Sequence, residues 1–317
     1  MTRTPPMLDA TKLSIIYEPK GRAREYAPLA CNLAVGCSHH CAYCYGPSAA
    51  HKAREVFEQG PVPTANALER LERDAARLEE ANDTRQTLFC FLTDPYCPEL
   101  VELTGEALMV MARHSRPFAV LTKGAWDAQA QFGLYFARDS FATTIVFADN
   151  DHCAEWEPNV EPSSVRWMAL HEAISRGIDT WISLEPVIYP AEALEIIERG
   201  AEVGVGHVKI GPLNYHPHAQ TVDWRRFGDD LAAVLAKTEI PYYLKHDMRR
   251  WMPPDCPVST LPLAVGAEAA LTCAVCGAEV VVASGSQPAL FGPQGPLRCA
   301  HDPLHEHGCT EEVAEAV

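Results

Sequence analysis

The stretch GCSHHCAYCYG, residues 36–46, places Cys37, Cys41 and Cys44 in one short loop, with gaps of three and two residues. Three thiolates at this spacing can close on one metal centre. Structural zinc usually takes four ligands as two separated pairs, and this loop holds no fourth cysteine. An iron–sulfur cubane held by three thiolates instead leaves one iron open for another molecule. The loop favours such a cluster, and zinc stays the competing interpretation.

Around this loop, short apolar runs alternate with amphipathic stretches, as is typical of strand–helix units around a parallel sheet. The expected strands are residues 29–35, 87–92, 118–122, 143–148, 180–187, 206–211 and 241–245. Six or more such units predict an α/β fold, a partial (β/α)6-type TIM barrel, with catalytic residues at the carboxyl ends of its strands. A doubly wound open sheet is the competing arrangement, because one sequence does not reveal strand order.

The expected helices show apolar residues at spacings of three or four, as in the face formed by Leu68, Leu71, Ala75 and Leu78. Similar faces lie in residues 103–113, 164–176, 191–199 and 229–237. The pattern breaks after Trp251 at MPPDCP. We therefore predict a barrel domain over residues 1–252 and a separate small unit over residues 253–317.

The composition argues against a protein that adheres broadly to nucleic acid, spans a membrane or is secreted. The 317 residues carry a formal charge of -16, which opposes broad adhesion to nucleic acid or anionic membranes but leaves room for a local basic groove. No run of about 18 apolar residues occurs, and the start, MTRTPPMLDATKLS, lacks the apolar stretch of a secretion signal. We expect a cytoplasmic protein without a membrane partner. In that reducing compartment, twelve cysteines indicate metal binding or chemistry rather than disulfides.

The loop resembles the signature of the radical S-adenosylmethionine superfamily, which has this cysteine spacing and an aromatic residue before the last cysteine, here Tyr43. The resemblance implies that Cys37, Cys41 and Cys44 bind a 4Fe-4S cluster whose open iron is chelated by the amino and carboxylate groups of S-adenosylmethionine. It also implies reductive cleavage to methionine and a 5'-deoxyadenosyl radical, with an electron donor such as flavodoxin or ferredoxin as partner. The cofactor carries the hard chemistry, and the protein positions it.

Further blocks resemble the spore photoproduct lyase-like, or DNA repair photolyase-like, branch of that superfamily over roughly residues 15–252. They are residues 17–47 (YEPKGRAREYAPLACNLAVGCSHHCAYCYGP), FLTDPYCPEL, AVLTKG, ISLEPV, VKIGPLNYH and DWRRFG. The spore photoproduct lyase branch acts on a thymine dimer in DNA. The acidic composition fits that substrate poorly, so these blocks indicate the branch and not the substrate.

Three charged residues stand at or near the ends of expected strands. Asp94 can accept a hydrogen bond from the ammonium group of S-adenosylmethionine, or simply start a turn before Pro95. Lys123 can pair with the ligand's carboxylate, or be a solvated lysine before a glycine turn. Glu185 lies in an otherwise apolar strand, so it indicates a ligand or substrate contact, with a satisfied structural pair as the alternative. By resemblance, Tyr43 lies against the adenine.

Several other side chains are weaker candidates for the same cavity. Lys209 and Asn214 follow or lie in a later strand, and His39 and His40 can tune the cluster through hydrogen bonds to sulfur. Cys90 and Cys97 flank the end of the second expected strand, where a thiol can return hydrogen to a substrate radical; a small buried hydrophobe is the plainer interpretation of each.

The last part of the chain holds a second cysteine group. Cys273 and Cys276 form the knuckle CAVCG, a half-site for zinc, and Cys299 and Cys309 complete a four-cysteine set. The fourth ligand is open, because His301, His305 and His307 compete with Cys309. We expect a small zinc-ribbon-like module that depends on its metal for folding, with an auxiliary iron–sulfur cluster or unligated thiols as alternatives.

The leading hypothesis is thus a radical S-adenosylmethionine enzyme, of lyase or oxidoreductase type, acting by hydrogen abstraction on an unidentified substrate. One alternative keeps the enzyme and assigns DNA photoproduct repair, which requires a local positive cleft. The other is a non-catalytic metal-binding regulatory or scaffold protein with zinc at both centres.

Overall fold

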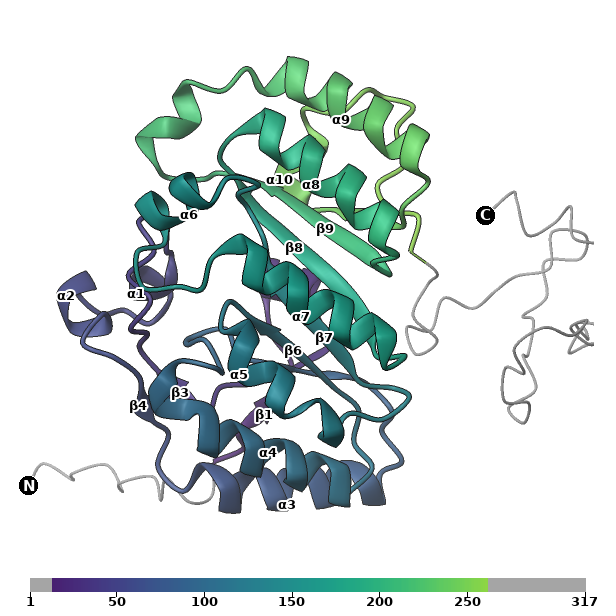
Figure 1. The fold of residues 1–317 in the computed structure, drawn as a ribbon. Helices are drawn as coiled ribbons and strands as arrows, with labels where there is room; N and C mark the ends of the chain where they lie inside the picture. The colour runs from purple at the N-terminus through teal and green to yellow at the C-terminus, as the bar shows by residue number, and fades with distance from the viewer. Residues whose placement is uncertain (1–12, 262–317) are drawn as a thin grey trace, which may run out of the picture. The chain divides into compact units, whose positions relative to one another are not determined.

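The computed structural model describes residues 13–261, which lie within the first unit of the chain, Met1–Pro262 (Figure 1). The strands are β1 (Ile16–Tyr17), β2 (Leu29–Cys31), β3 (Ala34–Val35), β4 (Val62–Pro63), β5 (Thr87–Phe89), β6 (Phe118–Thr122), β7 (Ser140–Thr144), β8 (Asp179–Val187), β9 (His207–Pro212) and β10 (Tyr242–Leu244). The α-helices are α1 (Gly46–Ala49), α2 (Arg54–Phe57), α3 (Ala67–Glu80), α4 (Val101–Arg113), α5 (Ala125–Ala130), α6 (Asn150–Trp156), α7 (Ser163–Ser175), α8 (Pro190–Val203), α9 (Trp224–Thr238) and α10 (His246–Arg249). Short 3-10 helices are η2 (Gly21–Glu25), η3 (Pro98–Leu100), η4 (Phe132–Leu134) and η5 (Pro217–Gln220).

Within residues 13–261 the strands form an eight-stranded sheet in the order β1-β2-β5-β6-β7-β8-β9-β10. The β1–β2 pair is antiparallel, and all the other neighbours are parallel. A doubly wound sheet reverses its strand order at a switch point, and this sheet does not. The α/β class is therefore confirmed, and the sequential order is consistent with a partial barrel. Helices α3, α4, α5, α7, α8 and α9 follow one another in chain order along the sheet (Figure 1).

The two faces of the sheet differ, because successive side chains of a strand point to opposite sides. Phe89, Phe141 and Ile182 belong to the large core that includes the buried faces of the helices. The residues next to them in the chain, Leu88, Ala142 and Trp181, belong to a smaller apolar cluster on the other face. That inner face leads toward the cavity described below.

Three expected strands differ from those observed. The strand expected at residues 87–92 ends early, as β5, Thr87–Phe89. Residues 29–35 divide into β2 and β3, because β3 pairs with β4 in a separate two-stranded sheet. The strand expected at residues 143–148 is β7, Ser140–Thr144, whose three hydroxyl side chains mask its buried character in the sequence. The apolar run 145–148 continues beyond it as a loop, with the Ile145 amide donating to the carbonyl of Ser183.

Residues after the predicted boundary at residue 252 still contact β10. The amide of Leu244 donates to the carbonyl of Val258 at 2.9 Å, and the amide of Thr260 donates to the carbonyl of Tyr242 at 3.1 Å. The separate unit stays a prediction. Its expected ligands lie outside the described residues; they are Cys273, Cys276, Cys299 and Cys309, with His301, His305 and His307.

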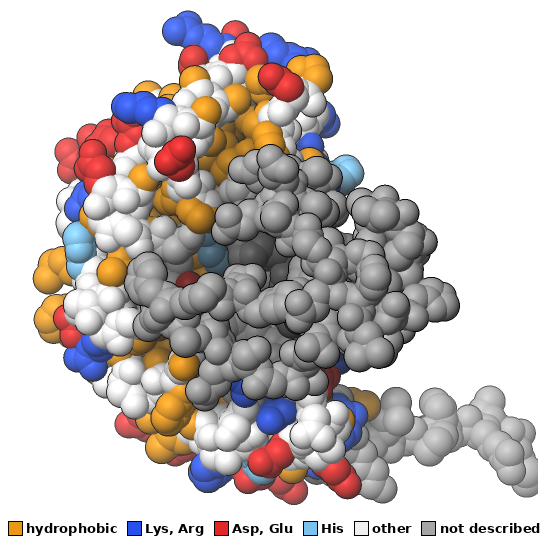
Figure 2. Space-filling view, turned by 90° about the vertical axis from the view of Figure 1, so that its right-hand side faces the viewer, with side chains coloured by type: hydrophobic (Ala, Val, Ile, Leu, Met, Phe, Trp, Pro, Cys, Tyr) orange, Lys and Arg blue, Asp and Glu red, His pale blue; other side chains and the backbone are white. Residues whose placement is uncertain are grey.

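The described surface carries charges of both signs. On the face in Figure 2, Lys and Arg side chains are interspersed with Asp and Glu rather than gathered into one field. Between residues 13 and 261, no helix has the length and apolar character needed to cross a membrane.

Candidate active site

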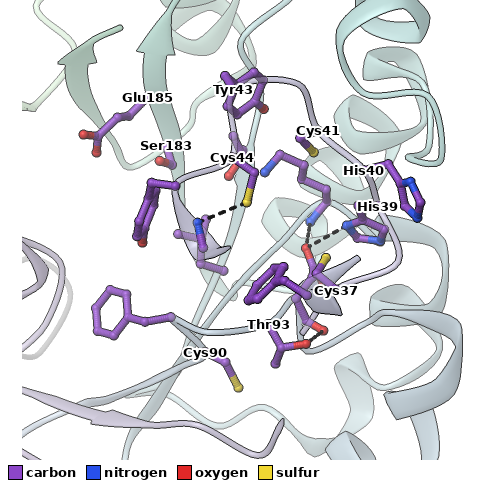
Figure 3. A pocket seen from close by; sticks show the side chains of 18 of the residues that line it. Cys37, His39, His40, Cys41, Tyr43, Cys44, Cys90, Thr93, Ser183 and Glu185 are labelled. Carbon is purple, nitrogen blue, oxygen red and sulfur yellow. Dashed lines mark hydrogen bonds and ion pairs between the residues drawn. The ribbon is translucent and has the colours of Figure 1, made fainter. Parts of the chain in front are cut away.

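Seven predicted site residues line one cavity (Figure 3). They are Cys37, Cys41, Tyr43, Cys44, Asp94, Lys123 and Glu185. The cysteine loop follows β3, whereas the charged residues follow β5 and β6 or lie near the end of β8. Because parallel strands bring their carboxyl ends to one edge of the sheet, residues up to 148 positions apart meet here.

Backbone contacts from distant segments fix the cysteine loop. The Gly36 amide donates to the carbonyl of Leu92 at 3.0 Å, and the Ala42 amide donates to the carbonyl of Trp156 at 2.9 Å. Gly36 has a φ of +116°, and a Cβ there would lie 2.3 Å from the carbonyl oxygen of Gly60. Only glycine fits this position, so the approach to Cys37 is set by backbone geometry.

The donors of the loop fit an iron–sulfur cluster. The eight cysteines among the described residues are all free thiols. The Gly46 amide donates to the sulfur of Cys44 at 3.3 Å, and hydrogen bonds of this kind tune cluster ligands. Burial raises the pKa of Cys41 to about 12, although Lys123 opposes that rise. Metal binding must therefore displace the proton of this thiol.

Lys123 brings a positive charge to the loop. Burial disfavours that charge, but Cys41, Glu157 and Asp94 outweigh burial and raise the pKa of Lys123. Its ammonium group lies 5.6 Å from the centre of the Tyr43 ring. The lysine is thus a cation beside the cysteines rather than a solvated surface residue.

Asp94 joins the ends of two strands. Its carboxylate accepts hydrogen bonds from the Lys123 amide at 2.8 Å, from the Thr122 hydroxyl at 2.5 Å and from the Tyr96 amide at 2.9 Å. His39 Nδ1 lies 3.6 Å from the same carboxylate. Both the turn and the cavity position expected for Asp94 are therefore present, while its role toward a ligand stays a prediction.

Behind the loop lies a buried ion pair that sequence reasoning missed. Arg166 and Glu157 have side chains that are 0% exposed, with 2.5 Å between Nη2 and Oε2. The Tyr43 hydroxyl donates to the other carboxylate oxygen of Glu157. Burial opposes ionisation of Glu157, but Arg166, Lys123 and Tyr43 together lower its pKa. One sequence signal could have indicated this pair. Arg166 stands next to Trp167 in α7, and both side chains are buried, so the arginine needs a buried partner.

Glu185 sits on the opposite wall, in contact with groups that the sequence did not single out. It accepts a hydrogen bond from the Tyr26 hydroxyl, and its carboxylate lies 3.4 Å from the ammonium group of Lys245. A Cβ on Gly211 would lie 2.7 Å from Glu185 Cδ, so the glycine makes room for the carboxyl group. Glu185 is thus structurally paired and also lines the cavity.

Of the weaker candidates, Lys209 and Asn214 are not among the lining residues. Lys209 donates to the carbonyl of Tyr26 at 2.7 Å, and burial together with Lys245 lowers its pKa to about 7. Asn214 donates to Asp247 at 3.1 Å. The remaining candidates lie in or beside the cavity: His39, His40 and Cys90 line it, and Cys97 contacts Cys37.

No known family profile matches the chain, and no curated protein sequence matches it. Solved structures do match. A spore photoproduct lyase double mutant with bound AdoMet and dinucleoside spore photoproduct has 16% sequence identity and a TM-score of 0.53, over 74% of this chain and 75% of that chain. A single mutant of spore photoproduct lyase has 15% identity and a TM-score of 0.54, over 76% of each chain.

A third structure, spore photoproduct lyase complexed with dinucleoside spore photoproduct, has 15% identity and a TM-score of 0.51, over 74% of this chain and 76% of that chain. Identities this low establish the fold. The resemblance read from the cysteine loop is therefore supported at the level of the fold: the chain shares the fold of spore photoproduct lyase.

Proposed function

We propose that the chain is a radical S-adenosylmethionine enzyme acting on an unidentified substrate. The carrying observation is that the three loop thiols line the same cavity as Tyr43, Asp94, Lys123 and Glu185. A bound 4Fe-4S cluster with S-adenosylmethionine supplies reductive cleavage of the sulfonium bond and a 5'-deoxyadenosyl radical for hydrogen abstraction. The reductant is a partner such as flavodoxin or ferredoxin.

The protein's own groups divide the task of binding. Cys37, Cys41 and Cys44 hold the cluster. Lys123 offers a fixed positive charge beside Cys41 for the carboxylate of S-adenosylmethionine, and Asp94 offers a carboxylate for its ammonium group. The ring of Tyr43 is held by the bond from its hydroxyl to Glu157 and lines the cavity, where we expect it to contact the adenine.

The rest of the cavity wall includes apolar side chains, which suit a reactive radical that must be kept from water. Phe57, Phe91 and Leu121 give it apolar surface, while Ser183 and Glu185 give it two polar positions on β8. Apolar lining excludes water from the reacting centre, and the few polar groups orient the bound molecule.

Glu185 can be tested through its neighbour. We expect Gly211→Ala to displace the Glu185 carboxylate, because the new Cβ would lie 2.7 Å from Glu185 Cδ. Loss of one hydrogen bond of about 0.5–1.5 kcal/mol should weaken binding of S-adenosylmethionine roughly 2- to 12-fold, measured by equilibrium dialysis on reconstituted protein. Gly133→Ala is the control, because nothing lies within 4 Å of a Cβ at that position. Equal dissociation constants for both variants would contradict a ligand contact by Glu185.

DNA photoproduct repair is the second candidate, and one observation favours it. The Arg22–Asp247 ion pair and the bond from the His246 amide to Glu25 join η2 to α10. These two joined segments carry the basic residues Arg22, Arg24, His246 and Arg249, and Lys245 at the start of α10 lies 3.4 Å from Glu185. The matching lyase structures hold a dinucleoside photoproduct. Conversion of that dinucleoside to intact thymidines by reconstituted protein would decide for this candidate.

The test of the leading proposal is reconstitution without oxygen, using iron, sulfide and a reductant such as dithionite. Protein loaded with about four irons per loop site should release 5'-deoxyadenosine and methionine from S-adenosylmethionine. Chromatography measures both products. Well-loaded protein that releases neither would overturn the enzymatic proposal. Zinc at the loop with no product would instead support the metal-binding scaffold.

A further inference from the structure

Cys97 forms a contact that the proposed cluster does not use. Its sulfur lies 3.6 Å from the sulfur of Cys37, although 60 residues separate them along the chain. The His39 ring offers a nitrogen to the same place, and these three donor atoms lie within 4.8 Å of one another. Among residues 13–261, this is the one group of three His, Cys, Asp or Glu side chains gathered so closely. Cys41 and Cys44 do not belong to it.

The spacing fits a single tetrahedral ion. Two sulfurs that are each about 2.3 Å from a tetrahedral zinc lie about 3.8 Å apart, close to the observed separation. Two thiols and one imidazole are donors that select zinc and other soft divalent ions over Mg²⁺ or Ca²⁺. Cys97 is buried and packs against Ala34 and Leu100, so this packing fixes the position of its side chain.

We propose that Cys37, His39 and Cys97 form a second metal site, which binds one Zn²⁺ when the cluster is absent. Binding displaces one proton from each thiol, so two thiolates balance the charge of the ion. A water molecule completes the coordination, and the Asp94 carboxylate lies 3.6 Å from His39 Nδ1. Cys37 belongs to both ligand sets. Zinc and the cluster therefore exclude each other, a consequence that rests on the proposed function.

The experiment uses the full chain, free of cluster, without oxygen and with a phosphine reductant. Zn²⁺ is titrated against a chromophoric chelator, and Co²⁺ is used in parallel because thiolate-to-cobalt absorption reports sulfur ligation. We expect the wild type to bind one equivalent more than Cys97→Ala or Cys97→Ser. Cys41→Ala should bind as many equivalents as the wild type. The tail cysteines contribute equally to all variants, so only the difference matters.

Cys90→Ala is the matched control, since Cys90 is also buried and lines the cavity without belonging to the three-donor group. It should retain the full zinc stoichiometry. Circular dichroism verifies that each variant is folded, and two different substitutions at Cys97 protect against a folding failure in one of them. Equal stoichiometry in the wild type and in both folded Cys97 variants would overturn the site.

Cluster loading separates this inference from the proposed function. After reconstitution, Cys97→Ala should take up as much iron as the wild type, whereas Cys41→Ala should not. A wild type that binds the extra zinc but takes up no iron would refute the proposed function and leave the zinc site standing. Loss of iron uptake in folded Cys97 variants would instead place Cys97 in the cluster ligand set and overturn the separate site.

Discussion

Cys41→Ala is expected to lower iron uptake at the loop from about four ions per chain to less than one, and to lower 5'-deoxyadenosine release at least about 100-fold. Cys41 is the middle thiol of the loop, and its side chain is buried against the cavity. With only Cys37 and Cys44 left, the cluster loses one of its three protein anchors. Iron analysis and chromatography of the products measure the two effects.

Cys90→Ala provides the comparison, because it removes another buried cysteine that lines the same cavity. This variant should keep its iron and its cleavage of S-adenosylmethionine. Full iron content and undiminished cleavage in Cys41→Ala would show that the loop is not the cluster site. Loss of both properties in Cys90→Ala as well would show that the assay reports general damage to the cavity.

Arg166→Met should cause the largest loss of stability. It leaves the buried carboxylate of Glu157 without its nearest cation, which costs about 3–5 kcal/mol of the free energy of unfolding. At roughly 2–4 °C per kcal/mol for a unit of this size, the melting temperature should fall by about 6–20 °C. The variant also loses the bond from Arg166 to the carbonyl of Thr144. Urea unfolding of wild type and variant measures the difference.

The effect should depend on pH in a defined direction. The pKa of Glu157 is lowered in the folded protein, so its pairing stabilises the fold above the ordinary carboxyl pKa and is lost as the pH falls through the lowered value. The penalty of Arg166→Met should therefore be larger at pH 7 than at pH 4. Arg226→Met is the control, because its partner Asp230 is exposed and 3.8 Å away, so the change should stay within about 0.5 kcal/mol. Equal losses in the two variants would refute the buried-pair argument.

Local patterns predicted much of the fold. The run at residues 118–122 is β6 without any change of boundary, and the face from Leu68 to Leu78 lies within α3. Periodicity succeeds there because each strand or helix buries one continuous set of side chains. It fails at β7, because three of its five buried residues carry hydroxyl groups.

The candidate site was predictable where a charged residue follows an apolar strand, as Lys123 follows β6 directly and Asp94 follows β5 after a short loop. Contacts between segments were not predictable in that way. Glu157 with Arg166, and Cys37 with Cys97, are pairs created only when separate strand–helix units come together. No local pattern reports such pairing, because its partners are chosen by the tertiary fold.

The anchoring of the cysteine loop has a consequence for the order of events during synthesis. The three cysteines are neighbours in the chain, yet the loop is tied by Ala42 to the carbonyl of Trp156 and by Tyr43 to Glu157. Closing contacts over more than 100 residues has an entropic cost that local contacts avoid, so the loop is shaped late. A nascent chain must expose residue 157 beyond the ribosome before the loop is complete. We therefore expect the loop to reach its final shape only after α6 docks against it.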